Sequence, residues 1–306
     1  MIAVLGSANM DLVTQVPHIP RPGETVLATG SQQFPGGKGA NQAVAAARLG
    51  ENVAFFGKVG QDPFGDELLR TLQADGIDVS DVERVAGIST GLATILVDEA
   101  AENAIACTPG ANASVDEAYV DRVFDRLCSA DVLLLQFEIP VSTIAYVLRR
   151  LPPDGPTIVL DPAPAQDLSS LPLQRIDVLT PNTTELIELT GTQDVAAAAR
   201  QLLARGVHAV LCKAGDQGAY WFSEQTFHIS AFPVAPVDTT AAGDAFNGAL
   251  ACVFHQLPIE RAIQWASAVG ALATTTHGAQ PSLPLRSTVD AFLEQHGSLP
   301  GSRKGR

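Results

Sequence analysis

Short apolar runs alternate with helical patterns along most of this chain, and that alternation limits the possible folds more than any other feature. The runs that predict buried strands are residues 2–5, 53–56, 132–135, 157–160, 176–179 and 209–212. Helical patterns fall between them at residues 40–49, 63–75, 115–128, 141–150, 184–190 and 194–205, and the chain after Thr239 is mostly helical. Strands that are apolar throughout and alternate with helices indicate a parallel sheet covered on both faces. The sequence therefore predicts an α/β three-layer sandwich with a mostly parallel central sheet.

Two segments interrupt this alternation. Residues 12–34 are rich in proline and glycine and carry short β-like pieces at 12–16 and 25–28, while residues 90–107 read as a hairpin around Asp98–Asn103. Neither segment contains a helix that would make it a βαβ unit. We predict a small antiparallel flap, a lid, which stands off the main sheet and covers a site or forms a subunit contact. The alternative is a pair of decorative loops.

Composition and charge narrow the class of protein. Of the 306 residues, 46% are hydrophobic, so a large core is available, and we expect one domain over residues 1–297 followed by a loose basic tail at 298–306. The net charge of −14 argues against nucleic acid or an anionic membrane as partners, since both require clustered Lys and Arg. The four cysteines are scattered without a CxxC, which predicts reduced thiols of a cytoplasmic protein, neither a zinc site nor disulfides.

The stretch Val237 to Leu250, VDTTAAGDAFNGAL, combines small residues with one carboxylate at the start of a helical pattern. Small residues leave the first backbone N–H groups of a helix open to an anion, which the helix dipole also favours. Asp244 lies in the predicted first turn, where a carboxylate can take the proton of a phosphoryl acceptor. Phe246, Leu250 and Val253 form the expected apolar stripe of an amphipathic helix. Plain helix capping by Thr or Asp is the alternative.

Two further motifs lie nearer the N-terminus. Gly6 to Asp11, GSANMD, follows the first predicted strand, where Asn9 and Asp11 offer an amide and a carboxylate to a polyol or simply form a turn. Residues 35–42, PGGKGANQ, precede a helix and place Lys38 among three glycines that allow close backbone approach. This is not a Walker A loop, because the glycine and the Ser or Thr of that pattern are missing. A glycine-rich turn remains the alternative.

Three polar motifs follow later strands, at the carboxyl edge where open α/β sheets bind ligands. They are Gln136-Phe137-Glu138, the run Thr180 to Glu185 (TPNTTE), and the run Lys213 to Gly218 (KAGDQG). Each also has a purely structural interpretation: helix capping near Glu138, a capping motif for Asn182 and Glu185, and a turn for Gly215 and Gly218. The grouping of all three at one edge of one sheet favours a binding site.

The ordered set of motifs resembles the ribokinase-like carbohydrate kinases. GSANMD, GGKGANQAVAAARLG, TPNTTE, KAGDQG, DTTAAGDAFNGAL and HGAQPS occur in the order seen in that family, and the resemblance spans residues 2 to about 293. It implies ATP-dependent phosphorylation of a sugar, with Asp244 as catalytic base and the amides of Ala241, Ala242, Gly243 and Asp244 as the anion hole. Positions that match the family's sugar ligands are Asn9, Asp11, Gly37, Lys38, Asn41, Glu138 and Asp244.

The same resemblance implies a nucleotide site and two kinds of cation. Nucleotide-side positions are Asn182, Lys213, Gly215, Gly218, Gly243 and Ser267, the last at the adenine. Glu185 matches the carboxylate that orders Mg²⁺ through water. Asp238, Thr240, Ala273, Thr276, Gly278 and Ser282 match an activating K⁺ site. The sequence departs from the family pattern at Lys213, where a threonine is frequent, and at Ser267 and Thr276, which replace bulkier residues.

The polar character of the expected sugar site favours ribose, phosphorylated at its 5-hydroxyl. A nucleoside kinase needs aromatic faces that stack a base, and the lid segments offer only Phe34. The acceptors 2-deoxyribose, fructose, a keto-deoxy acid and an adenosine-type nucleoside stay open, as does a non-catalytic sugar-binding protein on the same fold. A dinucleotide-dependent oxidoreductase is disfavoured because no GxGxxG follows a predicted strand. We expect a homodimer through the lid, where Ile95, Leu96 and Val97 are apolar.

Overall fold

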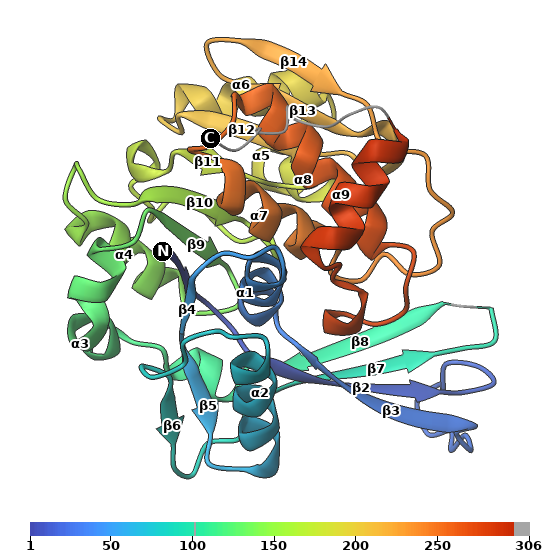
Figure 1. The fold of residues 1–306 in the computed structure, drawn as a ribbon. Helices are drawn as coiled ribbons and strands as arrows, with labels where there is room; N and C mark the ends of the chain where they lie inside the picture. The colour runs from blue at the N-terminus through green and yellow to red at the C-terminus, as the bar shows by residue number, and fades with distance from the viewer. Residues whose placement is uncertain (101, 297–306) are drawn as a thin grey trace.

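The computed structural model describes residues 1–100 and 102–296, and within them the main sheet has eight strands. Their order across the sheet is β14-β13-β12-β11-β10-β9-β1-β4 (Figure 1). The parallel strands are β4 (Val53–Phe56), β1 (Ile2–Leu5), β9 (Val132–Gln136), β10 (Thr157–Asp161), β11 (Val178–Leu179) and β12 (Ala209–Lys213). β13 (Ala219–Phe222) and β14 (Thr226–Ile229) extend the sheet in antiparallel fashion. All six predicted strands are confirmed. The β13–β14 hairpin was not predicted, because both strands are only four residues long and β14 has no buried residue.

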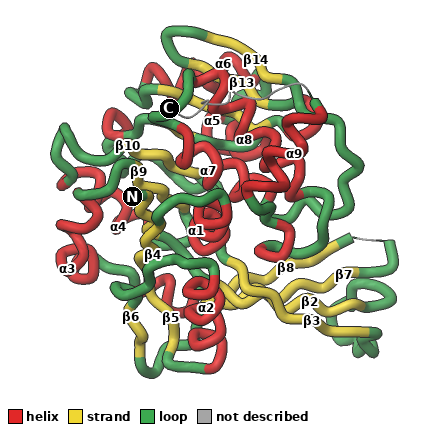
Figure 2. The backbone as a smooth tube through the Cα atoms, in the orientation of Figure 1, coloured by secondary structure: helices red, strands yellow, loops and turns green. Residues whose placement is uncertain are grey.

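Helices cover both faces of this sheet (Figure 2). One face carries α1 (Lys38–Arg48), α2 (Pro63–Ala74), α7 (Ala242–Val253), α8 (Ile259–Ala273) and α9 (Arg286–Gln295). The other carries α3 (Glu117–Cys128), α4 (Val141–Arg150), α5 (Thr183–Thr190) and α6 (Val195–Ala204). Alternate residues of one strand enter different cores: Val4 packs in the first, Leu5 in the second. Burial on both faces explains why the strands are continuously apolar and confirms the three-layer sandwich.

The lid is a separate four-stranded sheet in the order β3-β2-β7-β8. Its strands are β2 (Asn9–Gln15), β3 (Gly30–Gly36), β7 (Gly91–Val97) and β8 (Asn103–Thr108), which project away from the main sheet in Figure 1. The outer pairings are antiparallel, but β2 and β7 run parallel. The predicted β-like piece at 25–28 is wrong. Because β2 starts at Asn9 and pairs that residue with Gly36, its partner strand falls at residues 30–36.

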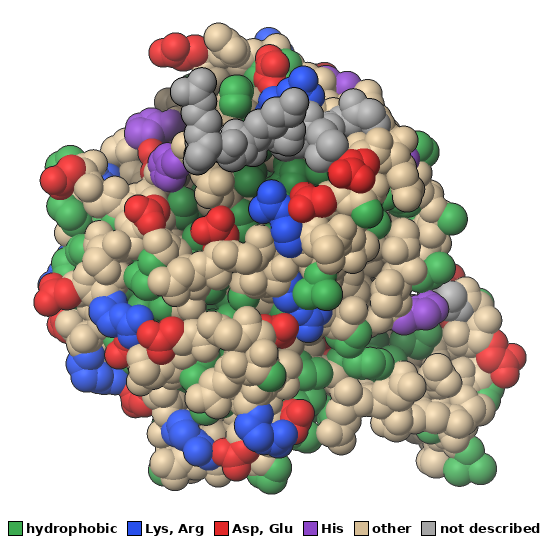
Figure 3. Space-filling model, in the orientation of Figure 1, with side chains coloured by type: hydrophobic (Ala, Val, Ile, Leu, Met, Phe, Trp, Pro, Cys, Tyr) green, Lys and Arg blue, Asp and Glu red, His purple; other side chains and the backbone are tan. Residues whose placement is uncertain are grey.

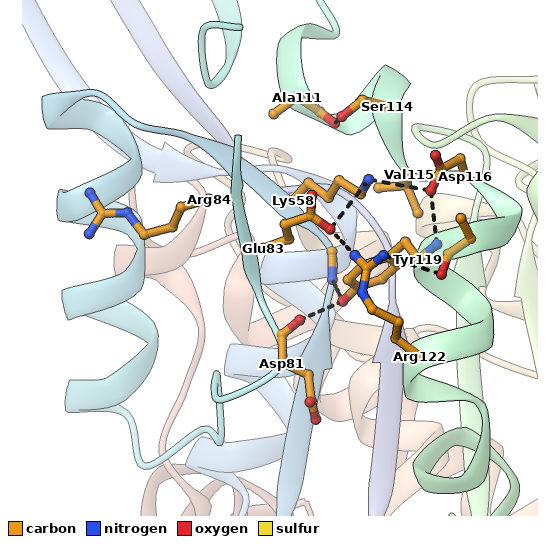
Figure 4. A network of polar contacts seen from close by, with 12 residues as sticks. Lys58, Asp81, Glu83, Arg84, Ala111, Ser114, Val115, Asp116, Tyr119 and Arg122 are labelled. Carbon is orange, nitrogen blue, oxygen red and sulfur yellow. Dashed lines mark hydrogen bonds and ion pairs between the residues drawn. The ribbon is translucent and has the colours of Figure 1, made fainter. Parts of the chain in front are cut away.

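A charged network fastens a small sheet, β5 (Lys58–Gly60) and β6 (Glu83–Val85), to the start of α3 (Figure 4). Nζ of Lys58 lies 3.5 Å from Oε2 of Glu83 and 3.3 Å from Oδ1 of Asp116. Asp116 in turn caps α3 by accepting a 2.9 Å hydrogen bond from the N–H of Tyr119. Arg122 pairs with Glu83 from the next turn of the helix. These three-residue strands are too short to show a hydrophobic period, so the sequence did not indicate them.

Helix α7 is buried on all sides. Every residue from Asp244 to Val253 is buried, so the expectation of an amphipathic helix with one apolar stripe is wrong. The physical reason is that α7 lies between α1 and α8 (Figure 1), and its small residues permit this close packing. A Cβ atom at Gly248 would lie only 2.6 Å from the carbonyl oxygen of Gln42 on α1. The packing holds the N-terminal turn of α7 in one place relative to α1.

The surface carries mixed charge. On the face shown in Figure 3, the Lys and Arg side chains are interspersed with Asp and Glu. Across residues 1–100 and 102–296, none of the helices has the length and apolarity that a membrane span requires. The predicted basic tail at 298–306, together with residue 297, lies outside the described residues.

Candidate active site

The first turn of α7 presents Asp244 beside backbone N–H groups that lack acceptors. Ala241 precedes the helix with φ of 59°, which makes it the one non-glycine with positive φ among the described residues. Ala242 donates to the carbonyl of Thr239 at 3.3 Å, and Ala245 donates to that of Ala241 at 2.8 Å. The hydrogen bonds of the described residues leave the N–H groups of Ala241, Gly243 and Asp244 unused. Helix N-termini of this kind bind anions.

Asp244 does not cap its helix. Its Oδ2 accepts a 2.9 Å hydrogen bond from Nδ2 of Asn41, and its Oδ1 accepts a 3.1 Å bond from Nε2 of Gln42. Both donors come from α1, so the packing of α1 against α7 sets the orientation of the carboxylate. Burial raises the pKa of Asp244 to about 6, with Lys38 opposing and Asp161 adding to the shift. The capping interpretation is thereby excluded. A carboxyl group whose pKa lies near neutral pH is suited to general-base chemistry.

A second polar cluster gathers around Glu138, just after β9. Its Oε2 accepts hydrogen bonds from Oγ of Ser7 at 2.5 Å, from Nδ2 of Asn9 at 3.3 Å and from the N–H of Lys38 at 3.0 Å. Asn112 fixes Asn9 by donating to its Oδ1 at 2.7 Å. Three distant motifs therefore meet at Glu138. The alternative of helix capping does not account for its side chain: Glu138 lies two residues before Pro140, the N-cap of α4, but α4 has no side-chain capping bond.

Asp11 joins this cluster from the lid. It lies on β2, as does Asn9, so the alternative of a simple turn is excluded for both. Burial, followed by repulsion from Glu138 and Asp244, raises the pKa of Asp11 to about 7. The lid therefore contributes a carboxyl group whose pKa depends on the charge of Asp244. The alternative of two decorative loops is excluded.

The glycine-rich motif forms the connection from β3 into α1. Gly37 precedes the helix with φ of 91°, and a Cβ atom there would lie 2.7 Å from the backbone nitrogen of Asn9. Only glycine permits both that backbone conformation and that approach. Lys38 follows in the first helical turn. Burial disfavours its charge, yet the surrounding carboxylates outweigh burial and hold the pKa of Lys38 above its ordinary value. Those carboxylates are Asp244, Asp161, Glu138 and Glu185.

A cavity of about 800 Å³ opens beside Asp244. The polar residues that line it include Lys38, Asp161, Asn182, Glu185, Lys213 and Asp216, together with Gly215, Gly218 and the residues 241–244. The apolar residues that line it include Phe232, Pro233, Val234, Pro236, Phe246 and Ala271, together with Gly270. Ser267 also lines it, and the Oγ atom of Ser267 is buried without a hydrogen-bond partner among the described residues. All six residues predicted for the nucleotide side therefore line one cavity, which meets the Glu138 cluster at Lys38 and Asp244.

The structural alternatives for the strand-end motifs are partly present in the same site. Asn182 and Glu185 form a capping box at the start of α5, and both side chains also line the cavity. Gly215 and Gly218 bound a short 3₁₀ turn that lines the cavity as well. Burial raises the pKa of Glu185, with Lys213 opposing. Capping and exposure to the cavity are therefore compatible at these residues.

The residues expected for a monovalent cation are only partly brought together. Asp238 accepts hydrogen bonds from the N–H groups of Thr240 at 2.9 Å and Gly278 at 2.8 Å. Although burial opposes the shift, these bonds hold the pKa of Asp238 below its usual range. Ala273 ends α8, Thr276 is exposed in the following turn, and Ser282 is buried in η4 (Gln280–Ser282). The hydrogen bonds of the described residues do not join these three to Asp238.

Sequence reasoning missed several members of the site. Gln42 and Gln136 belong to motifs in the sequence analysis but were given no role in the site, and Ser7 and Asn112 were not considered as site residues. In the structure, Nε2 of Gln136 donates a 2.7 Å hydrogen bond to Oε1 of Gln42 and thereby orients that amide. Asp161 was also missed, although it ends β10 and thus satisfies the same strand-end criterion as Glu138. Its side chain is almost completely buried between Gln42 and Lys213.

A buried carboxylate beside an open helix N-terminus, next to a cavity lined by both polar and apolar residues, is the arrangement of a phosphoryl transferase that acts on a polyhydroxylated acceptor. Comparison with known proteins identifies the family of phosphoryl transferases to which the chain belongs. The pfkB family of carbohydrate kinases matches residues 1–286, and this chain belongs to that family.

Individual relatives agree with this placement. The chain is 38% identical to a ribokinase of Haemophilus influenzae over 300 residues, covering 96% of this chain and 98% of the relative. It is also 38% identical to a deoxyribokinase of Salmonella typhimurium, over 95% of this chain and 98% of that protein. The structure of Arabidopsis thaliana ribokinase complexed with ribose and ATP superposes with a TM-score of 0.90 at 32% identity, covering 96% of this chain and 98% of that one. The chain is thus an ATP-dependent sugar kinase.

Proposed function

We propose that this kinase transfers the γ-phosphoryl group of ATP to the 5-hydroxyl of ribose, with Asp244 as the general base. The observation that carries the proposal is the meeting of one buried carboxylate and unused helix N–H groups at the junction of the cavity and the Glu138 cluster. The relatives that phosphorylate ribose support the choice of acceptor.

The reaction requires an acceptor oxygen in line with the γ-phosphorus. As the new O–P bond forms, the bond from phosphorus to the bridging oxygen of ADP breaks, and the hydroxyl proton passes to Asp244. With a pKa of about 6, Asp244 is mostly ionised at neutral pH and can accept that proton. The unused N–H groups of Ala241, Gly243 and Asp244 hold the charge of the migrating phosphoryl group, which is where a kinase gains most of its rate; the N–H of Ala242, also expected in the anion hole, already donates to the carbonyl of Thr239.

We assign the sugar hydroxyls to the Glu138 cluster. The residues assigned to the hydroxyls offer carboxylate, amide, ammonium and backbone groups, and one of them, Lys38, also lines the cavity; they are Asn9, Asp11, Gly37, Lys38, Asn41 and Glu138. Because these groups come from β2, α1 and the end of β9, a compact polyol can bridge the lid and the main domain. A purely apolar or aromatic acceptor lacks the hydroxyls that these groups require.

We assign the nucleotide to the cavity. The apolar lining residues suit the adenine ring, whose polar edge can satisfy the unpartnered Oγ of Ser267. Asn182, Lys213, Gly215, Gly218 and Gly243 then lie along the phosphates. Within the described residues no group of three or more His, Cys, Asp and Glu side chains forms a metal centre. A magnesium ion would therefore take most ligands from phosphate and water, and Glu185 fits it through water; when bound, Mg²⁺ neutralises phosphate charge.

We extend the proposal to an activating K⁺ near Asp238. The carboxylate is kept ionised by its hydrogen bonds, and the turn it anchors joins the start of α7 to the residues after α8. An ionised carboxylate suits a hard monovalent cation better than a soft transition metal. Dependence of kcat on K⁺, compared with Na⁺ and a tetraalkylammonium control, tests this part of the proposal.

We also propose a homodimer through the lid and a cytoplasmic location. The lid exposes Ile105 to 56% and keeps Ile95, Leu96 and Val97 half-buried, a combination that suits a second copy of the same sheet. All four cysteines are free thiols, which suits a reducing compartment. Sedimentation of the wild type and of an Ile105→Lys variant tests the dimer, because a charge in the interface shifts the protein towards monomer.

One competing acceptor has specific support. The Salmonella deoxyribokinase is as similar to this chain as the Haemophilus ribokinase, at 38% identity each. A coupled assay of ADP release with ribose, 2-deoxyribose, fructose and adenosine separates the acceptors. The proposal predicts the highest kcat/KM with ribose. A higher value with 2-deoxyribose would transfer the assignment to that sugar, and ADP release with none of them would contradict the sugar site.

A further inference from the structure

Lys213 and Asp161 form a buried ion pair in the wall of the cavity. Nζ of Lys213, at the end of β12, lies 3.1 Å from Oδ1 of Asp161, at the end of β10. The side chains are 13% and 3% exposed, respectively. Because β11 separates their strands in the sheet, the two residues reach across a neighbour to meet.

The ammonium group of Lys213 also lies at the helix N-terminus where the phosphoryl group is expected. A Cβ atom added to Gly243 would lie 3.4 Å from Nζ of Lys213. The hydrogen bonds recorded for Nζ among the described residues go only to Asp161, and an ammonium group has three donors. Two donors therefore remain next to the unused N–H groups of the α7 turn.

Asp161 is tied to the base as well. Its Oδ2 accepts a 3.1 Å hydrogen bond from Nε2 of Gln42, and the same Nε2 lies 3.1 Å from Oδ1 of Asp244. One buried carboxylate thus orients Lys213 on the phosphate side and shares an amide with the base on the acceptor side. A carboxylate whose only purpose was to neutralise Lys213 would not need this second connection.

We propose that Lys213 is a catalytic cation that contacts the transferred phosphoryl group. Asp161 is the positioning residue that holds the ammonium group of Lys213 at that place. This inference rests on the proposed phosphoryl-transfer function and adds to it a side-chain charge beside the helix amides. A preorganised cation acts where charge develops in the transition state, in a site with little water. The lysine contributes a point charge, whereas a hydroxyl at this position would contribute a dipole.

A double-mutant cycle of Lys213→Met and Asp161→Asn tests the inference. We expect Lys213→Met to lower kcat by about 10²–10³-fold, the usual effect of losing one charge-stabilising donor, with the KM for the sugar nearly unchanged. Asp161→Asn should lower kcat by about tenfold, because the lysine is kept but its ammonium group is no longer held in position by the carboxylate. The double variant should be no more active than Lys213→Met, since Asp161 has nothing to position once the lysine is gone.

The opposite result is equally specific. If Lys213 only neutralises Asp161, the double variant removes both charges together, and its kcat returns to within about threefold of the wild type. That recovery, or a wild-type kcat in Lys213→Met, overturns the proposal. Lys58→Met is the matched control, because Lys58 is also buried and paired with carboxylates but lies outside the cavity. It should lower the unfolding temperature and leave kcat unchanged.

A binding measurement separates this inference from the choice of acceptor. The complex of ADP, Mg²⁺ and aluminium fluoride mimics the transition state of phosphoryl transfer, so its binding can be measured without turnover of a sugar. We expect Lys213→Met to lose the extra affinity that aluminium fluoride confers on the wild type, while its affinity for ADP alone changes little. Full retention of that extra affinity would overturn the role of Lys213. Failure of the wild type to phosphorylate ribose would instead contradict only the acceptor.

Discussion

Nδ2 of Asn41 donates a 2.9 Å hydrogen bond to Oδ2 of Asp244, which joins the first turn of α1 to the first turn of α7. The two residues are 203 positions apart in the chain. Together with the bond from Gln42, this bond fixes the direction of the Asp244 carboxylate, and it opposes the rise in the pKa of Asp244 that burial causes.

Replacing the base should abolish most of the activity without unfolding the protein. Asp244→Asn keeps the shape of the side chain and removes its ability to accept a proton. We expect kcat to fall at least about 10²–10⁴-fold, the usual contribution of a general base, while sugar binding persists. Steady-state kinetics with isothermal titration of ribose checks both quantities. Retained turnover in this variant would remove Asp244 from its role.

The acidic limb of the pH profile should report the same carboxylate. Asp244 must be ionised to act, and its pKa is raised to about 6, so kcat should rise with pH through about 6 and then level off. Removing the Asn41 donor destabilises the ionised form, so Asn41→Ala should shift the limb to higher pH. A limb that stays in place would show that a different group controls the rate.

Asp11 should lower the stability of the free enzyme at neutral pH. Its pKa is about 7 in the folded protein against 3.8 as the ordinary value, so the folded state binds the proton more tightly. Stability should therefore fall as pH rises from about 4 to about 7, and the loss persists above that range. Because Asp11 is partly exposed, we expect Asp11→Asn to gain only about 1–2 kcal/mol at pH 8 and nothing near pH 3. Urea unfolding at both pH values measures the difference.

Ala241 should tolerate glycine but not a branched side chain. Its φ of 59° lies in the left-handed region, which β-branched residues rarely adopt. We expect Ala241→Val to destabilise the protein by about 1–3 kcal/mol, and Ala241→Gly to stay within about 1 kcal/mol of the wild type. Thermal unfolding of the two variants provides the comparison. Equal stability would indicate that this backbone conformation carries no strain.

The fold was predictable where a residue's surroundings follow from its neighbours in the chain. Strands such as IAVL and VLLL are apolar throughout because both faces of the sheet are covered, and their positions were confirmed. The β5–β6 and β13–β14 pairs escaped prediction, because short or half-exposed strands carry little hydrophobic pattern. The lid strand at residues 30–36 was misplaced because its position depends on the register with β2.

The site was predictable in its residue types but not in its connections. Strand-end and helix-start motifs pointed to Asp244, Glu138 and Asn41 without any coordinates. The sequence could not show that Gln42 bridges Asp244 and Asp161, since Gln42 lies on α1, Asp244 on α7 and Asp161 on β10.

By itself the sequence determined the layered α/β architecture, the position of one carboxylate at a helix start and the class of chemistry, transfer of a phosphoryl group to a sugar. These follow from local periodicity and from which side chains can be charged. The tertiary structure decided which polar groups meet: Lys213 pairs with Asp161, Asn41 bonds to Asp244, and Asn9 bonds to Glu138. Such pairings depend on strand order and helix packing, which bring together residues that the chain itself keeps far apart.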